Sequence, residues 1–401
     1  MSSCSVPIRR KNTVVEKVLM CNYDLSDNYD VIIRFHSAKI LSRNVLGGHP
    51  DPYFIANIDH VISFKSIALP RTLEPSWYDA EWIVRNISRH AELIVTLYDK
   101  YDRKLSDDFI GQFIIRDLIN YIPSTKGHDI INASNQYNGC FHLSIQSMKS
   151  SEETKQLPRY TLDSSCRYFC HNSMTMGRLT KINIDHTYPT WKIQMRRISF
   201  FFLPNQRQYW NKQYKSARAI FGNYPFSSTS RKSIKLAHKA LYEKTSRYNE
   251  NGSLNSSDDL WKFVFTNRIT KIIKPCIYTY VIDNYSWKFS ETGIGLFTDF
   301  VSKHALLANC SEYVCYAGEF HPRPKYGWDK WDDEWELVFD NNSRTYAPDA
   351  NLLINLKQLL VFNFPGLNIV TYDCEDPKLQ DSKEALTLAA QKYQNSLVTS
   401  Q

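Results

Sequence analysis

Glycine and proline are scarce, with 13 and 16 residues in a chain of 401, which excludes collagen-like chains and disordered chains rich in these residues. No uninterrupted apolar stretch approaches the roughly 18–20 residues that a membrane-spanning helix needs. The first twenty residues are charged and lack the apolar centre of a secretory signal. Motifs for myristoylation and prenylation are also absent. We therefore expect a cytoplasmic protein whose contact with any membrane is peripheral.

The sequence also lacks the common motifs of enzymes and of nucleic-acid-binding proteins. It contains no P-loop, no nucleophile elbow and no H-E-x-x-H zinc motif. It contains no RNA-recognition motif either, so we do not expect nucleic acid as a partner.

The nine cysteines are odd in number and scattered, and we expect them to be free thiols in a reducing compartment. Cys166, Cys170 and His171 form one close group, and Cys310 and Cys315 form another. These side chains could supply zinc ligands, but the two groups are far apart and neither has the C-x2-C spacing. Buried free thiols are therefore the expected state.

What the chain does have is a composition typical of soluble globular proteins, with 43% apolar and 22% charged residues. Its length suggests two or three domains. The net charge of +8 is unevenly distributed, because residues 187–250 carry 13 Lys and Arg against 2 Asp and Glu. Such a basic segment could meet lipid headgroups, nucleic acid or the acidic C-terminal third of the same chain.

Residues 31–147 have the pattern of an all-β sandwich. Short apolar runs rich in β-branched and aromatic residues are separated by turn-prone or charged stretches. These runs predict strands at residues 31–35, 53–58, 92–98, 109–115 and 140–145.

Within this region, four short motifs occur in a specific order. Asp51-Pro52-Tyr53 follows a Gly-Gly loop, and Leu73-Glu74-Pro75-Ser76-Trp77 comes next. Tyr98-Asp99-Lys100-Tyr101-Asp102 then leads to Asp107-Asp108-Phe109-Ile110-Gly111. This order resembles a C2 domain, over residues 28–148. The resemblance implies an eight-stranded β-sandwich whose loops at one end often hold Ca²⁺ and dock on phospholipid.

The resemblance also implies a set of metal ligands. Four positions match loop carboxylates of the family, and we take them as candidate Ca²⁺ ligands: Asp51, Asp99, Asp102 and Asp108. Val45, with Asn44 beside it, stands where the family has its first acid, and the spacing from Asp99 to Gly111 is one residue longer than usual. Lost charge lowers affinity for the ion. A solvated acidic loop without metal remains the alternative.

A contact with anionic phospholipid is also expected at these loops, whether or not Ca²⁺ binds. Val45, Leu46 and Leu105 could insert apolar tips into the membrane interface. Lys100, Arg103 and Lys104 flank them and could meet anionic headgroups. The alternative is a C2 sandwich that serves as a scaffold for protein partners.

The whole chain is expected to be multidomain, an all-β C2 sandwich followed by an α+β domain. We assign residues 1–27 to an N-terminal tail, 28–148 to the C2 domain, 149–186 to a linker, 187–380 to the α+β domain and 381–401 to a C-terminal tail. The α+β domain resembles the C-terminal region of uncharacterised fungal C2-domain proteins, a likeness that implies no activity. Helices are expected at residues 212–219, 233–242, 350–363 and 381–397.

Five ionisable residues in this domain could form an acid–base or metal site: Glu291, His304, Glu319, His321 and Asp340. Glu319 and His321 are two residues apart and would share one face of a strand. Structural pairing of these groups is the alternative. In the basic segment, cations alternate with aromatic residues, which suits a membrane interface, single-stranded nucleic acid or a solvated helix face.

Together, these features predict a peripheral membrane protein whose C2 domain binds anionic phospholipid and presents a second domain. One alternative is an enzyme whose C-terminal domain acts on a membrane substrate, with the C2 domain as its targeting module. The other is a protein–protein adaptor.

Overall fold

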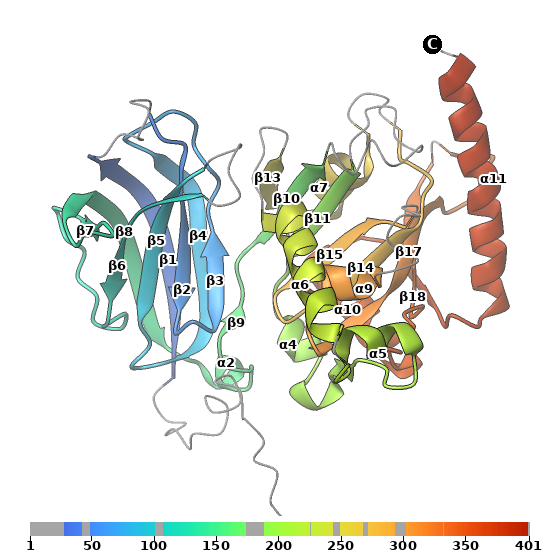
Figure 1. Ribbon diagram of the computed structural model, residues 1–401, viewed down its shortest axis with the longest axis horizontal. Helices are drawn as coiled ribbons and strands as arrows, with labels where there is room; N and C mark the ends of the chain where they lie inside the picture. The colour runs from blue at the N-terminus through green and yellow to red at the C-terminus, as the bar shows by residue number, and fades with distance from the viewer. Residues whose placement is uncertain are drawn as a thin grey trace, which may run out of the picture. The chain divides into compact units, whose positions relative to one another are not determined.

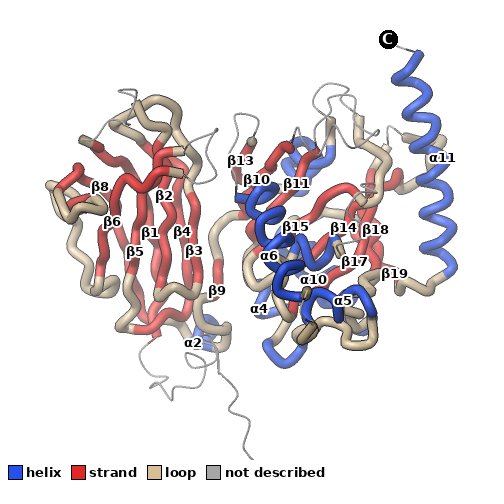
Figure 2. Tube along the Cα trace, in the orientation of Figure 1, coloured by secondary structure: helices blue, strands red, loops and turns tan. Residues whose placement is uncertain are grey.

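The computed structural model describes residues 28–41, 49–100, 107–173, 188–224, 226–243, 249–267, 272–292, 302–331 and 333–399. The chain divides into two compact units, residues 1–99 with 109–160, and residues 100–108 with 161–401. None of the helices within the described ranges is long and apolar enough to cross a membrane. Figure 2 shows strands in both units and almost all of the helices in the second.

The first unit consists of antiparallel strands in the order β3-β2-β5-β6-β7-β8-β1-β4 (Figure 1). A single residue pair, Gln112 with Ile131, joins β6 to β7, so the strands form two four-stranded halves of a curled sheet. The strands are β1 (Asn28–Ile40), β2 (Pro52–Ile58), β3 (Ile62–Lys65), β4 (Ser76–Ser88), β5 (Leu93–Asp99), β6 (Asp108–Ile115), β7 (His128–Ile131) and β8 (Tyr137–Lys149).

Aromatic side chains fill the space between the two halves. Alternate residues of β5 are buried, as the period of two along a strand requires. Phe54 of β2 packs against Phe35 of β1 with ring centroids 4.5 Å apart, and against Trp77 of β4 at 4.9 Å. Such pairs add stabilisation beyond the area that they bury. These contacts hold strands together that are distant in the sequence.

Residues 149–160 pack onto this sandwich. After the short helix α2 (Glu152–Lys155), the carbonyl of Leu157 accepts a 2.6 Å hydrogen bond from Asn86 Nδ2. The Tyr160 hydroxyl donates to Asp59 Oδ2 at 2.6 Å. The first part of the range that we assigned to a linker therefore belongs to the first unit.

The second unit is built on a sheet in the order β13-β10-β11-β15-β14-β17-β18-β19. Its neighbouring strands are antiparallel, except that β18 and β19 are parallel. The strands of this sheet are β10 (Cys166–Ser173), β11 (Tyr188–Gln194), β13 (Glu250–Leu254), β14 (Tyr278–Ile282), β15 (Ser286–Glu291), β17 (Tyr316–Pro324), β18 (Trp335–Asp340) and β19 (Ile369–Tyr372).

Short strands and helices complete this unit. The strands are β9 (Thr161–Leu162), β12 (Gln208–Tyr209) and β16 (Tyr313–Val314). The helices are α4 (Ile198–Phe201), η1 (Pro204–Gln206), α5 (Lys215–Phe221), α6 (Ser227–His238), η2 (Lys239–Glu243), α7 (Ser257–Leu260), η3 (Trp261–Phe265), α9 (Lys303–Leu307), η4 (Ala350–Leu352), α10 (Leu353–Asn363) and α11 (Pro377–Thr399).

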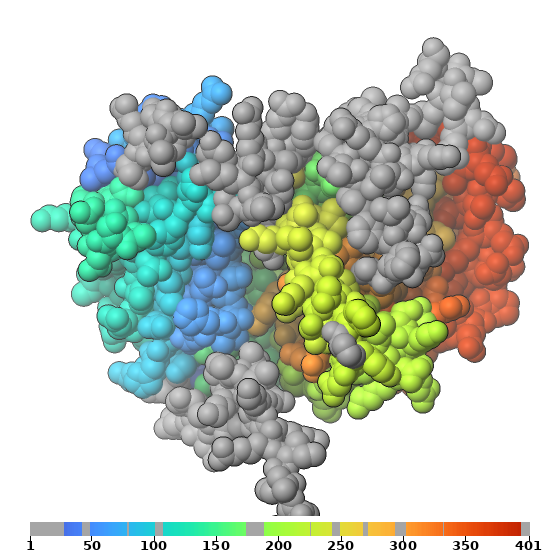
Figure 3. Space-filling view, in the orientation of Figure 1, coloured from blue at the N-terminus to red at the C-terminus, as the bar shows by residue number. Residues whose placement is uncertain are grey.

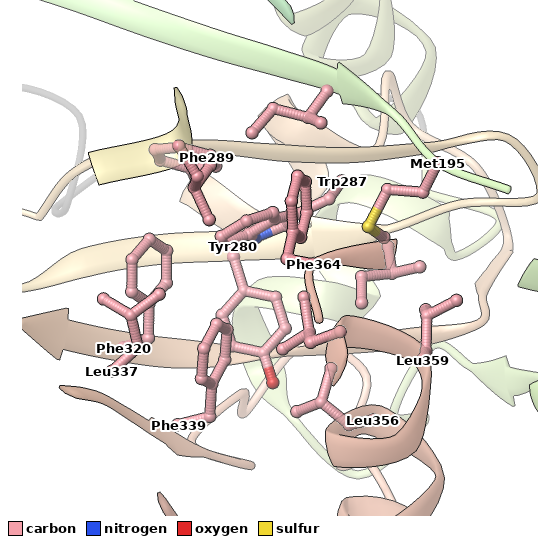
Figure 4. Close-up of a cluster of buried hydrophobic side chains, with 14 of the residues drawn as sticks. Met195, Tyr280, Trp287, Phe289, Phe320, Leu337, Phe339, Leu356, Leu359 and Phe364 are labelled. Atoms are coloured by element: carbon pink, nitrogen blue, oxygen red, sulfur yellow. The ribbon is translucent and has the colours of Figure 1, made fainter. Parts of the chain in front are cut away.

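One face of the second sheet carries a large apolar core. Tyr280, Phe320 and Phe339 project from neighbouring strands toward Leu356 and Leu359 of α10 (Figure 4). The rings of Phe320 and Phe339 stack at 4.8 Å between centroids. This core anchors β14, β17 and β18, whose opposite face carries both polar and apolar side chains.

The opposite face packs against α5, α6 and α9. Ile220 of α5, Ile234 of α6 and Leu307 of α9 share a second apolar cluster with Val281 of β14 and Ala317 of β17. The sheet therefore has helices on both faces, although its strands are mostly antiparallel, whereas we expected an α+β unit, in which helices typically cover one face or one end of the sheet.

The range 149–186 differs from the linker that we expected, because it also contains β10. Six of the eight residues of β10 are buried, and they include Arg167 and His171. Polar residues in a buried strand hide it from a search for apolar runs. The range 381–401 also differs from a free tail, because α11 begins at Pro377 and buries Leu379 and Leu386.

Candidate functional sites

Two of the candidate calcium ligands lie side by side at one end of the first unit. Pro52 at the start of β2 pairs with Asp99 at the end of β5. The backbone N–H of Asp51 donates to Asp99 Oδ1 at 2.8 Å, and the N–H of Arg71 donates to Asp51 Oδ1 at 2.7 Å. Asp99 is 5% exposed. The strand pairing therefore brings the two carboxylates to the same edge.

The other loop candidates are only partly described. Asp108 is the first residue of β6, and both Asp108 and Lys100 are half-buried. The rest lie outside the described residues: Val45, Leu46, Asp102, Arg103, Lys104 and Leu105. Within the described residues, no group of three or more His, Cys, Asp or Glu could hold a metal ion. Asp51 and Asp99 supply the hard oxygen donors that Ca²⁺ prefers, but Ca²⁺ takes six to eight ligands.

The sandwich matches a known family by sequence. Residues 30–131 match the family model of the C2 domain. This part of the chain is a C2 domain. The match covers about a quarter of the chain and leaves residues 161–401 of the second unit outside it.

Solved structures resemble the chain weakly. The first C2 domain of plant extended synaptotagmin 1 is 17% identical, with 31% of this chain and 96% of that one covered, at a TM-score of 0.27. Human GIVD cytosolic phospholipase A2 is 14% identical, with 37% of this chain and 21% of that one covered, at 0.26. The calcium-bound pair of C2 domains of extended synaptotagmin 2 is 20% identical. The likeness covers 36% of this chain and 56% of that one, at a TM-score of 0.25. No curated protein matches the chain.

The candidate acid–base residues of the second unit meet in a network of ion pairs. Lys383 Nζ of α11 lies 2.8 Å from Glu319 Oε2 and 2.9 Å from Asp340 Oδ2. Asp340 Oδ1 accepts hydrogen bonds from the backbone N–H groups of Glu319 and Asn342. Burial raises the pKa of Asp340, against the opposing effect of Lys383. Glu319 and Asp340 thus share one cation.

Glu291 and His304 adjoin this network. Lys274 Nζ lies 2.7 Å from Glu291 Oε2. The ring of His304 places Nε2 3.1 Å from the carbonyl oxygen of Gly318. Burial lowers the pKa of Lys303 to about 8, although Glu319 and Glu291 attract its positive charge. Lys303 therefore lies within electrostatic reach of both carboxylates.

His321 takes part in a separate set of contacts. Its Nε2 lies 2.8 Å from Ser382 Oγ, which also accepts a 3.0 Å hydrogen bond from Arg323 Nη1. Arg323 Nε in turn donates to Glu336 Oε1 at 2.6 Å. The imidazole is fully buried, and burial lowers its pKa to about 3, with Lys383 and Arg323 acting in the same direction. His321 is therefore neutral at physiological pH.

A pocket of about 480 Å³ opens next to these residues. Asn342 lines it and donates from Nδ2 to Glu319 Oε2 at 2.9 Å, and Arg344 and the thiol of Cys374 also line it. Burial raises the pKa of Cys374, with Asp373 as a further cause, so the thiol is protonated at neutral pH. The pocket offers amide and guanidinium donors but no thiolate.

The lysines of this network were missed by the sequence analysis. Lys303 begins α9, 12 residues after Glu291, and Lys383 lies in α11, 64 residues after Glu319. Only the packing of these helices on the sheet brings the charges together, and no spacing within the sequence signals it. The two-residue spacing did place Glu319 and His321 on one strand, β17.

Proposed function

We propose that this protein binds anionic phospholipid at cytosolic membrane surfaces through its C2 domain, with Ca²⁺ between the loop carboxylates. The observation that carries the proposal is the placement of Asp51 and Asp99 at one edge of the sandwich, joined by the 2.8 Å hydrogen bond. In the proposed site, Asp102 and Asp108 would add further oxygen ligands.

The electrostatics of such an edge support a membrane switch. Closely spaced carboxylates repel one another and repel lipid phosphate. A bound divalent cation reverses the local potential and can take a lipid phosphate oxygen as a further ligand. Val45, Leu46 and Leu105 would then enter the interface, while Lys100, Arg103 and Lys104 would meet headgroups.

Vesicle co-sedimentation tests this function. The full chain should pellet with phosphatidylserine–phosphatidylcholine vesicles, and more strongly with Ca²⁺ than with EGTA. Replacing Asp99→Asn together with Asp102→Asn should abolish the calcium dependence. Asp129→Asn is a control for the removal of a single carboxylate, because this exposed residue lies on β7 and is not a candidate ligand.

Two results would contradict the proposal. Absence of pelleting under both conditions would remove the lipid role. Unchanged calcium dependence in the double variant would show that other residues hold the ion.

We propose no reaction for the second unit. Glu291, Glu319 and Asp340 each hold a lysine ammonium within 2.9 Å, and His321 is neutral in a fully buried position. The pairs of Glu319 and Asp340 with Lys383 join α11 to the sheet, and groups that are paired in this way are poorly placed to exchange protons with a substrate.

A further inference from the structure

A second charged surface lies on α5 and α6 and just before α5, outside the C2 domain. Six exposed cations belong to this basic helix surface: Lys212, Lys215, Arg218, Lys232, Lys235 and Lys239. The sequence from residue 188 to residue 242 contains no Asp or Glu at all. No acidic side chain within this stretch therefore compensates the positive charge of its lysines and arginines.

The packing of the two helices turns these cations outward. α5 buries Ala217 and Ile220, and α6 buries Ile234 and His238. Figure 3 shows α6 in yellow and α5 in yellow-green on the same side of the second unit. The apolar side of each helix is thus buried in the unit, and the basic side of each helix is exposed to solvent.

The exposed face of α6 combines charge with an apolar side chain. Lys232, Lys235, Leu236 and Lys239 follow the i, i+3, i+4, i+7 spacing that places residues on one face of a helix. Leu236 is 62% exposed in the middle of this group. Long lysine side chains can lay their stems along an apolar surface while their ammonium groups stay in a polar layer.

Other cations of the same acid-free stretch have partners within the fold. Arg197 pairs with Asp163 at 2.9 Å, and the guanidinium of Arg207 lies 4.3 Å from the ring centre of Tyr313. Arg231 donates to the carbonyl of Ile220 at 2.8 Å. The six surface cations, in contrast, form no ion pair with any residue that the structure describes. Their charge is available to an external partner.

We infer that the basic helix surface is a second membrane-binding surface, which docks on anionic phospholipid headgroups without calcium. The charge is complementary to a phosphatidylserine-containing leaflet, and Leu236 gains from entering the interface, where a nucleic-acid backbone would leave it in water. Two contacts on one chain bind far more stably than one, because the second becomes intramolecular. This surface adds to the C2 contact and does not depend on the calcium ligands.

The test compares two triple variants of the full chain. Lys232→Ala, Lys235→Ala and Lys239→Ala remove three cations from α6 and its C-terminal cap while keeping good helix formers. Lys357→Ala, Lys378→Ala and Lys392→Ala remove three exposed lysines from α10 and α11, with the same change in net charge. Partitioning onto phosphatidylserine–phosphatidylcholine vesicles is measured in EGTA and in Ca²⁺, at low and moderate salt.

The α6 variant should bind about 100-fold more weakly in EGTA, since each lysine near an anionic surface contributes about fivefold. The α10–α11 control should bind nearly as wild type. Leu236→Gln should weaken binding less and keep its salt dependence, because it removes apolar contact and no charge. Pure phosphatidylcholine vesicles should not discriminate among the proteins.

The outcomes separate this inference from the proposed C2 function. If wild type binds vesicles and the α6 variant binds equally well, the inference is wrong while the C2 function stands. If the α6 variant loses binding to a single-stranded oligonucleotide and keeps binding to vesicles, the surface serves nucleic acid. If wild type pellets under neither condition, both are wrong.

Discussion

At the scale of single residues, Lys383 balances two carboxylates that the fold removes from water. Asp340 is 1% exposed and Glu319 is 16% exposed in their side chains. Replacing Lys383→Met leaves both charges without their shared cation, and removal of one partner of a buried pair costs about 3 kcal/mol or more. We expect a loss of this size in the free energy of unfolding, measured in urea at pH 7.

Lys325→Met is the control for this variant. Lys325 pairs with Glu334 at 2.6 Å, but both side chains are well exposed, and such pairs contribute at most about 1 kcal/mol. Equal losses in the two variants would contradict the assignment. The Lys383→Met loss should shrink as pH falls, because Asp340, with its raised pKa, takes up a proton more readily in the folded state.

His321 predicts a further dependence on pH. Its pKa falls from 6.5 to about 3 on folding, so the unfolded chain binds the proton more tightly. The stability from a neutral His321 is present above pH 6.5 and is lost as pH falls toward 3. Between pH 7 and pH 5, wild type should lose about 2 kcal/mol more than His321→Gln, in urea unfolding at each pH. Equal losses in the two proteins would show that folding does not lower the pKa of His321.

The positions of single site residues could be predicted best from the sequence where the residues belong to one short motif. The Asp51-Pro52-Tyr53 and Asp99 motifs lie at the edge where β2 and β5 pair. The partners of Glu319 and Glu291 could not be predicted, because Lys383 lies 64 residues and Lys274 lies 17 residues away along the chain, in separate elements that only tertiary packing brings near.

At the scale of elements, β17 and the end of β18 approach so closely that Gly318 has no space for a side chain. A Cβ at this position would lie 2.0 Å from the carbonyl oxygen of Asp340. Gly318→Ala should therefore force the strands apart and destabilise the second unit by about 3 kcal/mol, measured by thermal unfolding.

Gly327→Ala is the comparison for the same hairpin. Gly327 has φ of 95°, but a Cβ there would meet nothing within 4 Å. Only backbone strain of about 1 kcal/mol is expected. A larger loss for Gly327→Ala than for Gly318→Ala would contradict the packing of β17 described above.

Strands with a clear period of two were predicted within a few residues, as residues 53–58 show against β2. β4 was missed because charged residues such as Glu81 and Arg85 interrupt its apolar pattern, although Trp82 and Val84 are buried. β15 was missed for a related reason: all six of its residues are buried, including Lys288 and Glu291. Burial of polar groups depends on partners from other strands and helices, which a local pattern does not contain.

At the scale of the whole molecule, the boundary after the C2 sandwich can be tested with fragments. Residues 28–160 should unfold cooperatively on their own. Residues 28–148 should be about 3 kcal/mol less stable, because they lose the hydrogen bonds of Ser150 to Asp30, Asn86 to Leu157 and Tyr160 to Asp59. Urea unfolding followed by tryptophan fluorescence measures the difference, and equal stabilities would place the boundary at residue 148.

The pairing of β1 has a consequence for synthesis on the ribosome. β1 lies between β4 and β8, and its partner β8 is the last strand of the sandwich to be translated. Until β8 emerges from the exit tunnel, one edge of β1 has no neighbour, and the apolar side chains that β8 covers stay accessible to chaperones or to other nascent chains. A pause in translation before residue 137 would prolong this exposed state, whereas a pause after the sandwich is complete would allow the C2 domain to close before the second unit is made.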